Sequence, residues 1–283
     1  MSHPAVTQAA VIAREPPSGA DRADGDTGTD TQLVGYVVLD RGVSLVRDRA
    51  REAELVSQWR RVYDDLYSGD ASHDGEQLDP TEFGEDFGGW NSSYTGKPIA
   101  LEHMREWRAA TVARIRELGP ARVLEIGVGT GLLLSQLAPH CEEYWGTDFS
   151  APTIDALRSR LAERQDPWVE RVHLRVQAAD DLGGVPHGVF DTVVLNSVVQ
   201  YFPNAGYLID VIGTALRLLR PGGALFLGDV RNLALLREFA TGVQIAHADA
   251  DTTAWCFAIG CAGALPPSRS CCSRPSSSQH CRR

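Results

Sequence analysis

A glycine-rich turn is the segment of this sequence whose residue types and spacing are best suited to chemistry. It runs Glu125-Ile126-Gly127-Val128-Gly129-Thr130-Gly131. Glycines are needed in such a turn because the backbone must bend sharply and let a ligand approach within van der Waals contact. Turns that bind a dinucleotide pyrophosphate have the spacing GxGxxG, whereas this turn has GxGxG and an acidic residue two positions before the first glycine. Since an anion-binding loop has little use for a carboxylate, the pattern favours a ligand with a cationic amino group.

Polar residues at the ends of the following strands extend the same site. Asp148 ends the second predicted strand, where a carboxylate can accept hydrogen bonds from both hydroxyls of a ribose. Ala179-Asp180 follows the third strand and can bind adenine through a backbone N–H and a side-chain oxygen. Asn196 ends the fourth strand, at the carboxyl edge where open α/β sheets bind ligands.

An amino group, a ribose and an adenine together describe S-adenosyl-L-methionine. NAD-type binding and an α/β domain without a ligand remain the alternatives at this point. The residues predicted to bind the cofactor are Glu125, Gly127, Gly129, Gly131, Asp148, Ala179, Asp180 and Asn196.

Alternating strands and helices from Arg122 onward predict the sheet that positions these residues. Such alternation is typical of an α/β fold with a parallel sheet and crossover helices. Helices are expected to begin near Gly131, Ser150 and Asn204, and Pro221-Gly222-Gly223 is expected to end the third. The predicted strands are Val123–Ile126, Glu143–Thr147, Val172–Gln177, Asp191–Leu195 and Ala224–Asp229. We assign residues 121–254 to this core.

Residues 46–120 are predicted to form a helical cap on the core. Apolar residues at helical spacing predict helices over Arg47–Tyr67 and Pro98–Leu118. Between them, Phe83–Gly96 is an aromatic loop with too many glycines for a regular element. Residues 1–45 contain two short β-branched segments, Ala9–Ala13 and Leu33–Leu39, around a polar loop at 15–31.

The composition argues against several classes of function. The net charge is −10, and residues 1–254 hold 23 basic against 37 acidic side chains. This balance argues against nucleic-acid binding through a basic surface. No stretch approaches the roughly 20 apolar residues of a membrane helix, and a signal peptide is not recognisable, so we expect a cytoplasmic protein with no membrane partner. No His or Cys spacing in the body suggests a metal.

Several blocks of the sequence resemble one family, the methyltransferase domains embedded in the adenylation domains of nonribosomal peptide synthetases. The blocks are Trp90 to Gly96, Glu102 to Trp107, Val123 to Gly131, Glu143 to Ser150, Asn196 to Pro203 and Gly228 to Asn232. Residues 1–45 independently resemble a remnant of the adenylation lid subdomain, in which these domains are inserted. The resemblance implies a Rossmann-like class I methyltransferase sheet with an N-terminal helical cap and this lid remnant, originally part of a larger synthetase.

The resemblance also implies a reaction, the N-methylation of an aminoacyl residue held as a thioester on a carrier protein. The nucleophile must be a neutral amine, and an α-amine has a pKa of about 8, so little general-base help is required. Catalysis should come mainly from positioning and water exclusion. Two groups of side chains are candidates for the substrate site. One lies in the aromatic loop, and the other follows the last two predicted strands. They are Trp90, Asn91, Tyr94, Asn196, Gln200, Tyr201 and Asp229. Trp90 and Tyr94 could equally pin the N-terminal helices, and Asp229 could simply cap a turn.

The sequence departs from the family pattern at its two ends. Its one lysine, Lys97, lies in the methyltransferase block, so adenylation is not expected. Residues 255–283 are rich in Cys, Ser, Pro and Arg without periodicity, and we expect a disordered or frameshifted tail. The sheet should then stop after its fifth strand, which leaves Ala224–Leu227 on an exposed edge. A stand-alone small-molecule methyltransferase and an inactive synthetase fragment remain alternatives.

Overall fold

A computed structural model describes residues 6–14, 32–39, 47–67 and 82–248. The chain divides into two compact units, Met1–Asp48 and Arg49–Arg283. Each unit is described by itself. The polar loop at 15–31 and the segment 255–283 lie outside the described residues.

The first unit contains an antiparallel pair of strands. β1 (Val6–Arg14) pairs with β2 (Gln32–Leu39), with Ile12 opposite Val34. Both predicted strands are therefore present, and β1 is longer than expected. Their assignment to an adenylation lid stays a prediction.

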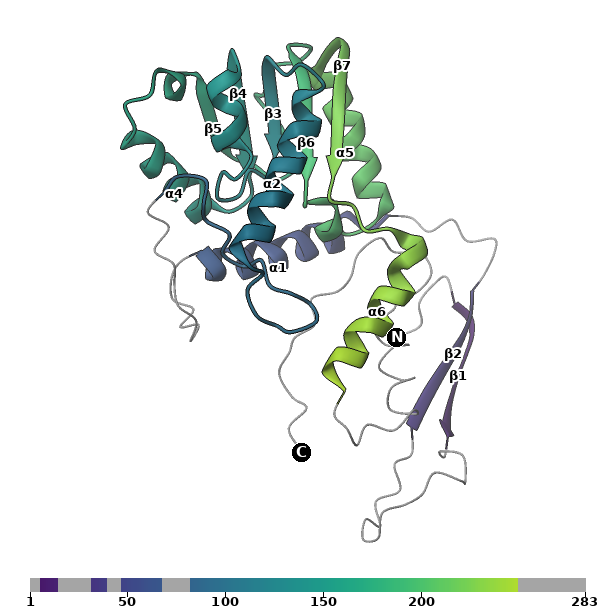
Figure 1. The fold of residues 1–283 in the computed structure, drawn as a ribbon. Coiled ribbons are helices and arrows are strands. Elements are labelled where there is room, and N and C mark those ends of the chain that lie inside the picture. Colours follow the sequence, from purple (N-terminus) through teal and green to yellow (C-terminus); the bar gives the residue numbers. More distant parts are fainter. Residues whose placement is uncertain (1–5, 15–31, 40–46, 68–81, 249–283) are drawn as a thin grey trace. The chain divides into compact units, whose positions relative to one another are not determined.

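The second unit is built on a five-stranded parallel sheet (Figure 1). Its strands are β3 (Arg122–Ile126), β4 (Glu143–Asp148), β5 (Val172–Val176), β6 (Phe190–Asn196) and β7 (Leu219–Gly228). In the order β5-β4-β3-β6-β7, the strands β4 and β5 are added on one side of β3, and β6 and β7 are added on its other side. The switch point lies between β3 and β6. Parallel α/β sheets bind ligands at such a switch point, outside the carboxyl ends of the strands.

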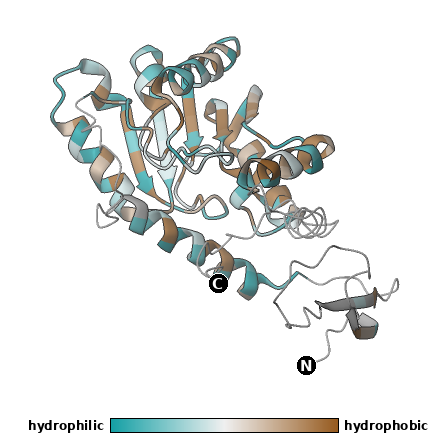
Figure 2. Cartoon of the chain, turned by 60° about the horizontal axis from the view of Figure 1, so that its bottom comes forward, coloured by the Kyte–Doolittle hydropathy of each residue, from teal (hydrophilic) through white to brown (hydrophobic). Residues whose placement is uncertain are grey.

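Alternate residues of the strands face two apolar cores, one on each side of the sheet. Val123 and Tyr144 pack with α2 (Leu101–Arg116), α3 (Leu134–Leu137) and α4 (Ala151–Ala162). Leu124 and Trp145 face the other side and pack with α5 (Ala205–Leu218). Every residue of β6 is buried because helices cover both of its faces. Figure 2 shows the sheet, with brown segments on several strands, between helices of mixed hydropathy.

Helix boundaries follow the predicted starts at two places and differ from the prediction at two others. The Ser150 hydroxyl accepts from the Thr153 N–H (3.4 Å), and the Asn204 amide oxygen accepts from the Tyr207 N–H (2.9 Å), so both residues act as N-caps. The helix expected near Gly131 begins only at Leu134 and has one turn, because Gly131 has a φ of 84° and Pro139 follows shortly in a 3-10 turn, η1 (Ala138–His140). The expectation that Pro221 ends the third helix is wrong, since α5 ends at Leu218 and Leu219 already pairs with Phe190.

Helix α1 (Arg49–Tyr67) lies across the carboxyl ends of the strands (Figure 1). The Ser150 hydroxyl donates to Asp64 (2.6 Å), and the Asn204 amide donates to Glu52 (2.8 Å). Two acidic side chains of α1 are thus bound to the N-cap residues of α4 and α5, where the positive ends of the helix dipoles also favour negative charge.

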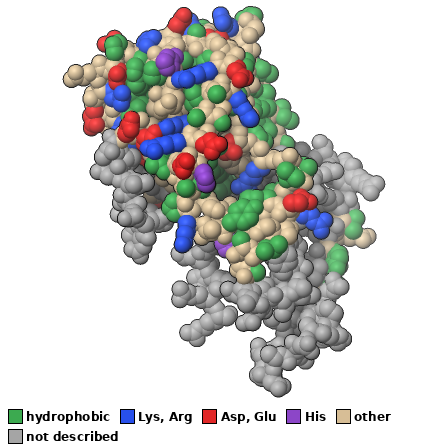
Figure 3. All heavy atoms as spheres, viewed as in Figure 1, with side chains coloured by type: hydrophobic (Ala, Val, Ile, Leu, Met, Phe, Trp, Pro, Cys, Tyr) green, Lys and Arg blue, Asp and Glu red, His purple; other side chains and the backbone are tan. Residues whose placement is uncertain are grey.

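The sheet ends at β7 within the described part of the chain. Leu227 on this strand is 40% exposed, so the predicted exposed edge is present there. A 3-10 turn, η4 (Leu233–Leu235), and a final helix, α6 (Leu236–His247), follow β7. Within these described ranges, no helix combines the length and apolar character needed to cross a membrane. On the face drawn in Figure 3, Lys and Arg side chains are interspersed with Asp and Glu.

Candidate functional site

The glycine turn connects β3 to α3 and has the backbone geometry that its composition predicts. Gly127, Gly129 and Gly131 all have positive φ, at 83°, 51° and 84°. The N–H groups of Gly127 and Val128 donate to the Thr147 carbonyl at 2.7 and 2.9 Å, which holds the turn against the end of β4. A Cβ at Gly127 would lie 2.4 Å from a methyl of Val198, whereas one at Gly129 would meet nothing within 4 Å. A side chain at position 127 would therefore overlap Val198, whereas a side chain at position 129 would meet open space.

Replacing Gly127 with alanine is expected to lower the free energy of unfolding by about 3 kcal/mol, from left-handed strain plus overpacking against Val198. Gly222→Ala is the matched control, because Gly222 also has a positive φ (80°) but nothing within 4 Å of its Cβ position. This control should cost only about 1 kcal/mol. Urea unfolding without ligand measures both, and equal losses would show that contact with Val198 is not the cause.

Glu125 is buried on the wall of a cavity beside this turn. Burial raises the pKa of its carboxyl to about 8, although the Tyr144 hydroxyl, which donates to it at 2.6 Å, partly opposes this shift. The negative charge of Asp148 raises the pKa further. A buried carboxyl with one hydrogen-bond donor is suited to a ligand that brings a positive charge.

Asp148 lies at the carboxyl end of β4 on the same cavity wall. Its two oxygens accept the N–H groups of Gly129 and Ser150, each at 3.0 Å. Burial raises its pKa, and these backbone hydrogen bonds partly lower it. One carboxylate thus links the glycine turn to the start of α4 and still has lone pairs for a ligand.

The cavity has a polar wall and an aromatic wall. The polar wall is formed by the glycine turn and the ends of β4 and β6, and it includes the predicted residues Glu125, Gly127, Gly129, Asp148, Ala179 and Asn196. On the aromatic wall, Trp59 and Tyr63 of α1 pack on Tyr201 with ring centroids 4.8 and 5.4 Å away. Trp90 also lines the cavity and packs on Trp107 at 4.6 Å.

Other predicted residues lie beside the cavity rather than on its wall. Gly131 packs under α4, because its Cβ would lie 2.8 Å from Leu157. Asp180 is exposed and accepts a 2.6 Å hydrogen bond from the hydroxyl of Tyr207, which lines the cavity. Tyr94 packs on Phe239 of α6. Binding roles for these residues stay predictions.

Three residues nominated for catalysis meet at Ser197, which the sequence analysis did not single out. The Asn196 amide donates to the Ser197 hydroxyl (3.1 Å), and the Gln200 amide donates to the Ser197 carbonyl (2.8 Å). The Ser197 hydroxyl donates to Asp229 (2.6 Å). Ser197 and Asn196 line the cavity, whereas Gln200 and Asp229 contact Ser197 without being among the lining residues.

Comparison with known proteins agrees with this geometry. Residues 124–225, from β3 into β7, match the model of a methyltransferase domain family. This chain carries a methyltransferase domain. Its fold is that of a Rossmann-like parallel α/β sheet.

The methyltransferase domain is similar to segments of very large synthetases. The chain is 46% identical over 244 residues to a probable nonribosomal peptide synthetase, CymA, of Salinispora arenicola, covering 86% of this chain and 3% of that protein. It is 44% identical over 247 residues to chondramide synthase of Chondromyces crocatus, covering 87% of this chain and 6% of that protein. The chain thus spans only a few per cent of the length of these curated relatives.

A solved structure is also similar, the N-methyltransferase NodS of Bradyrhizobium japonicum in complex with S-adenosyl-L-homocysteine. The identity is 19%, the TM-score is 0.45, and the match covers 66% of this chain and 83% of that chain.

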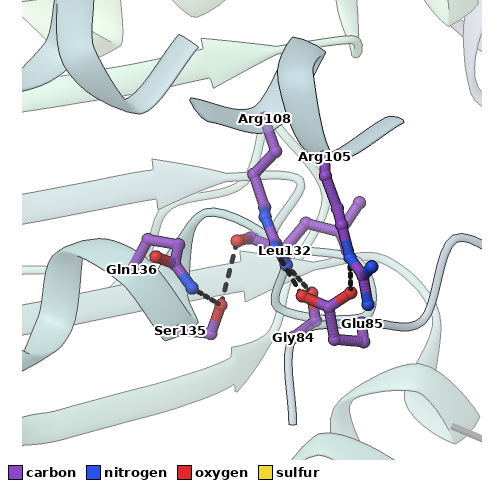
Figure 4. Close-up of polar contacts among 7 residues, drawn as sticks. All are labelled: Gly84, Glu85, Arg105, Arg108, Leu132, Ser135 and Gln136. Atoms are coloured by element: carbon purple, nitrogen blue, oxygen red, sulfur yellow. Dashed lines mark hydrogen bonds and ion pairs between the residues drawn. The ribbon is translucent and has the colours of Figure 1, made fainter. Parts of the chain in front are cut away.

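The aromatic loop of the methyltransferase domain is fixed to α2 by a buried ion pair (Figure 4). Arg108 donates to the Gly84 carbonyl and to the Glu85 carboxylate, and Arg105 binds the other oxygen of Glu85 at 2.7 Å. Burial alone would raise the pKa of Glu85, but the two arginines lower it below its usual value. Next along the loop, the Asp86 carbonyl accepts from the Thr130 hydroxyl (2.8 Å), so the loop that carries Trp90 is also tied to the glycine turn.

Arg108→Met is expected to destabilise the domain by about 3 kcal/mol, because it leaves a carboxylate and a carbonyl without their buried donor. Arg105→Met is the matched control, since Arg105 binds the same carboxylate but its side chain is 53% exposed, against 10% for Arg108. An exposed pair contributes less than about 1 kcal/mol. Chemical unfolding measures both variants, and similar losses would contradict the assigned role of burial.

Several wall residues were missed by sequence reasoning. Trp59 and Tyr63 belong to the predicted helix Arg47–Tyr67, and only the docking of α1 brings them to the cavity. Tyr207 of α5 likewise lines the cavity. Among the described residues, no group of three or more His, Cys, Asp or Glu side chains could hold a metal ion.

Proposed function

We propose that this domain uses S-adenosyl-L-methionine to methylate the α-amino nitrogen of an aminoacyl residue that is tethered to a carrier protein by a thioester. One observation carries the cofactor assignment: two buried carboxyl groups, those of Glu125 and Asp148, line the same cavity on either side of a glycine turn.

The donor groups of the cavity fit the parts of this cofactor. Glu125 is suited to the cationic α-amino group, and Asp148 to the ribose hydroxyls. Ala179, which lines the cavity, and Phe149 beside Asp148 are suited to adenine. When bound, the cofactor supplies a methyl group on a positively charged sulfur.

The aromatic wall supports a substrate that presents an uncharged nucleophile. An α-amine has a pKa of about 7.7 to 8.0, so a neutral fraction is present near pH 7 without a strong base. Trp59, Tyr63 and Tyr201 cover the cavity and exclude water from a bound amine. The chain would then act by holding amine and methyl donor together in a dry site.

The tethered aminoacyl substrate is supported by the names of the relatives, which are peptide synthetases that contain a similar segment. For the same reason, we place the domain within a larger synthetase. Residues 1–45 would be its adenylation-lid remnant, residues 46–120 its helical cap and residues 121–254 its core.

Two measurements test the proposal in sequence. Calorimetry of the purified chain with S-adenosyl-L-methionine should give one binding site, and no heat would refute the cofactor assignment. Mass spectrometry should then detect a mass gain of one methyl group on aminoacyl-pantetheine thioesters. Methylation of free amino acids but not of thioesters would instead favour a stand-alone enzyme.

A further inference from the structure

Two backbone positions at the ends of neighbouring strands are held in an unfavourable conformation. Ser197 follows β6 with a φ of 60°, and Asp229 follows β7 with a φ of 54°. Within the described ranges, no other residue except glycine has a positive φ. Such a conformation costs about 1 to 3 kcal/mol per residue, and it persists where the surrounding structure enforces it, often at functional sites.

The hydrogen bonds around Ser197 determine what its hydroxyl can still do. Its single proton is donated to an Asp229 oxygen at 2.6 Å, and one of its lone pairs accepts from the Asn196 amide at 3.1 Å. A serine hydroxyl has one proton and two lone pairs. Ser197 lines the cavity, so a ligand there finds an oxygen with one remaining lone pair and no proton to give.

Asn196 adds a second acceptor next to this hydroxyl. Asn196 is buried and lines the cavity, and its amide oxygen has no hydrogen-bond partner among the described residues. Gly228 is required beside it, since a Cβ there would lie 2.1 Å from that oxygen. A buried acceptor without a donor is costly and calls for an explanation. This unpaired oxygen thus marks the same end of β6 as the strained backbone of Ser197.

We propose that the Ser197 hydroxyl accepts a hydrogen bond from the substrate amine, and that Asp229 takes up through Ser197 the proton that methylation releases. This inference rests on the proposed function, and it assigns the residues that bind the substrate amine and take up its proton.

The proton balance explains why an amine suits this arrangement. When the nitrogen–carbon bond forms and the carbon–sulfur bond breaks, the nitrogen is left with a positive charge and a surplus proton. That proton passes to the Ser197 oxygen while the Ser197 proton passes to the Asp229 carboxylate, which is exposed and can release it to water. An amine attacks while it still holds its protons, so the carboxylate relay takes one up as the bond forms. A hydroxyl must lose its proton before attack, and a carboxylate is a weak base for that task.

Two variants test the inference without imposing backbone strain. Ser197→Gly removes the hydroxyl, and glycine tolerates a φ of 60°. Asp229→Asn keeps an acceptor for Ser197 but cannot take up a proton, and asparagine also tolerates this region. Thermal melts should therefore show both variants folded.

The first readout is binding, not turnover. In the complex with S-adenosyl-L-homocysteine, the wild-type chain should bind alanyl-pantetheine amide about tenfold more tightly than propionyl-pantetheine amide, which lacks only the amine. Ser197→Gly should lose that preference, and Asp229→Asn should retain it. Equal binding of the two ligands by the wild-type chain, or an unchanged preference in Ser197→Gly, would overturn the role of Ser197.

The second readout is the rate of a single turnover across pH. Asp229→Asn should slow methylation by about 100-fold, as expected for loss of a positioned proton acceptor, and the deficit should shrink as pH and buffer concentration rise. A wild-type rate at every pH would overturn the role of Asp229. Absence of S-adenosyl-L-homocysteine binding by the wild-type chain would refute the proposed function itself, and the inference with it.

Discussion

Asp148→Ala is expected to weaken binding of S-adenosyl-L-methionine by about 100-fold or more. The substitution removes an acceptor suited to two ribose hydroxyls, and each hydrogen bond to a charged group contributes about 1.5 to 3 kcal/mol. It also leaves the N–H groups of Gly129 and Ser150 without their acceptor, so the glycine turn loses its link to α4. Calorimetry on the purified chain measures the loss.

Asp191 offers a matched control for this experiment. It is also a buried strand aspartate that accepts backbone N–H groups, those of Ala121 and Arg122, but it lies at the amino end of β6, away from the cavity. Asp191→Ala should reduce stability while cofactor affinity changes less than threefold or so, since no ligand group is near it. A comparable loss of affinity in both variants would assign the effect of Asp148 to folding alone.

Glu125→Gln is expected to remove a fall in stability between about pH 5 and pH 8. The wild-type carboxyl has a pKa of about 8 when folded and near its ordinary value of 4.5 when unfolded. Between these values the folded chain binds the extra proton, so the free energy of unfolding decreases as pH rises, by at most about 1.4 kcal/mol per pH unit. Urea titrations at several pH values measure the slope, which should be present in the wild-type chain and absent in the variant.

The same carboxyl should make cofactor binding release a proton. At about pH 6.5 the amino group of the ligand is charged and Glu125 is neutral, and the approach of that charge favours the ionised carboxylate. Calorimetry in buffers of different ionisation enthalpy should therefore detect close to one proton released by the wild-type chain. Glu125→Gln should release none, and it should bind about tenfold more weakly because a charged hydrogen bond becomes a neutral one. Equal proton release would contradict the assignment.

Local pattern was sufficient to predict the parts of the site that depend on one strand and its turn. The GxGxG turn and the apolar runs of β3, β4 and β6 placed Glu125 and Asp148 correctly at one sheet edge, because parallel strands that follow each other bring their carboxyl ends together.

Features that depend on contacts between distant segments could not be predicted. The sequence of α1 shows an apolar face, but nothing local indicates that Trp59 would meet Tyr201 or that Asp64 would bind Ser150. Similarly, Asp180 was expected to face the cofactor, and only the fold brings the Tyr207 hydroxyl to its carboxylate. Ser197 was overlooked because a serine after a strand is common, and its significance lies in the three partners that surround it.

The attachment of α1 to the N-caps of α4 and α5 has a kinetic consequence. If a ligand beneath Trp59 and Tyr63 exchanges through lifting of the helix, its association and its dissociation pass through the same opening step. Weakening the contact of Glu52 with Asn204, or of Asp64 with Ser150, would then speed exchange in both directions. The lifetime of the complex would thereby depend partly on residues that never touch the ligand.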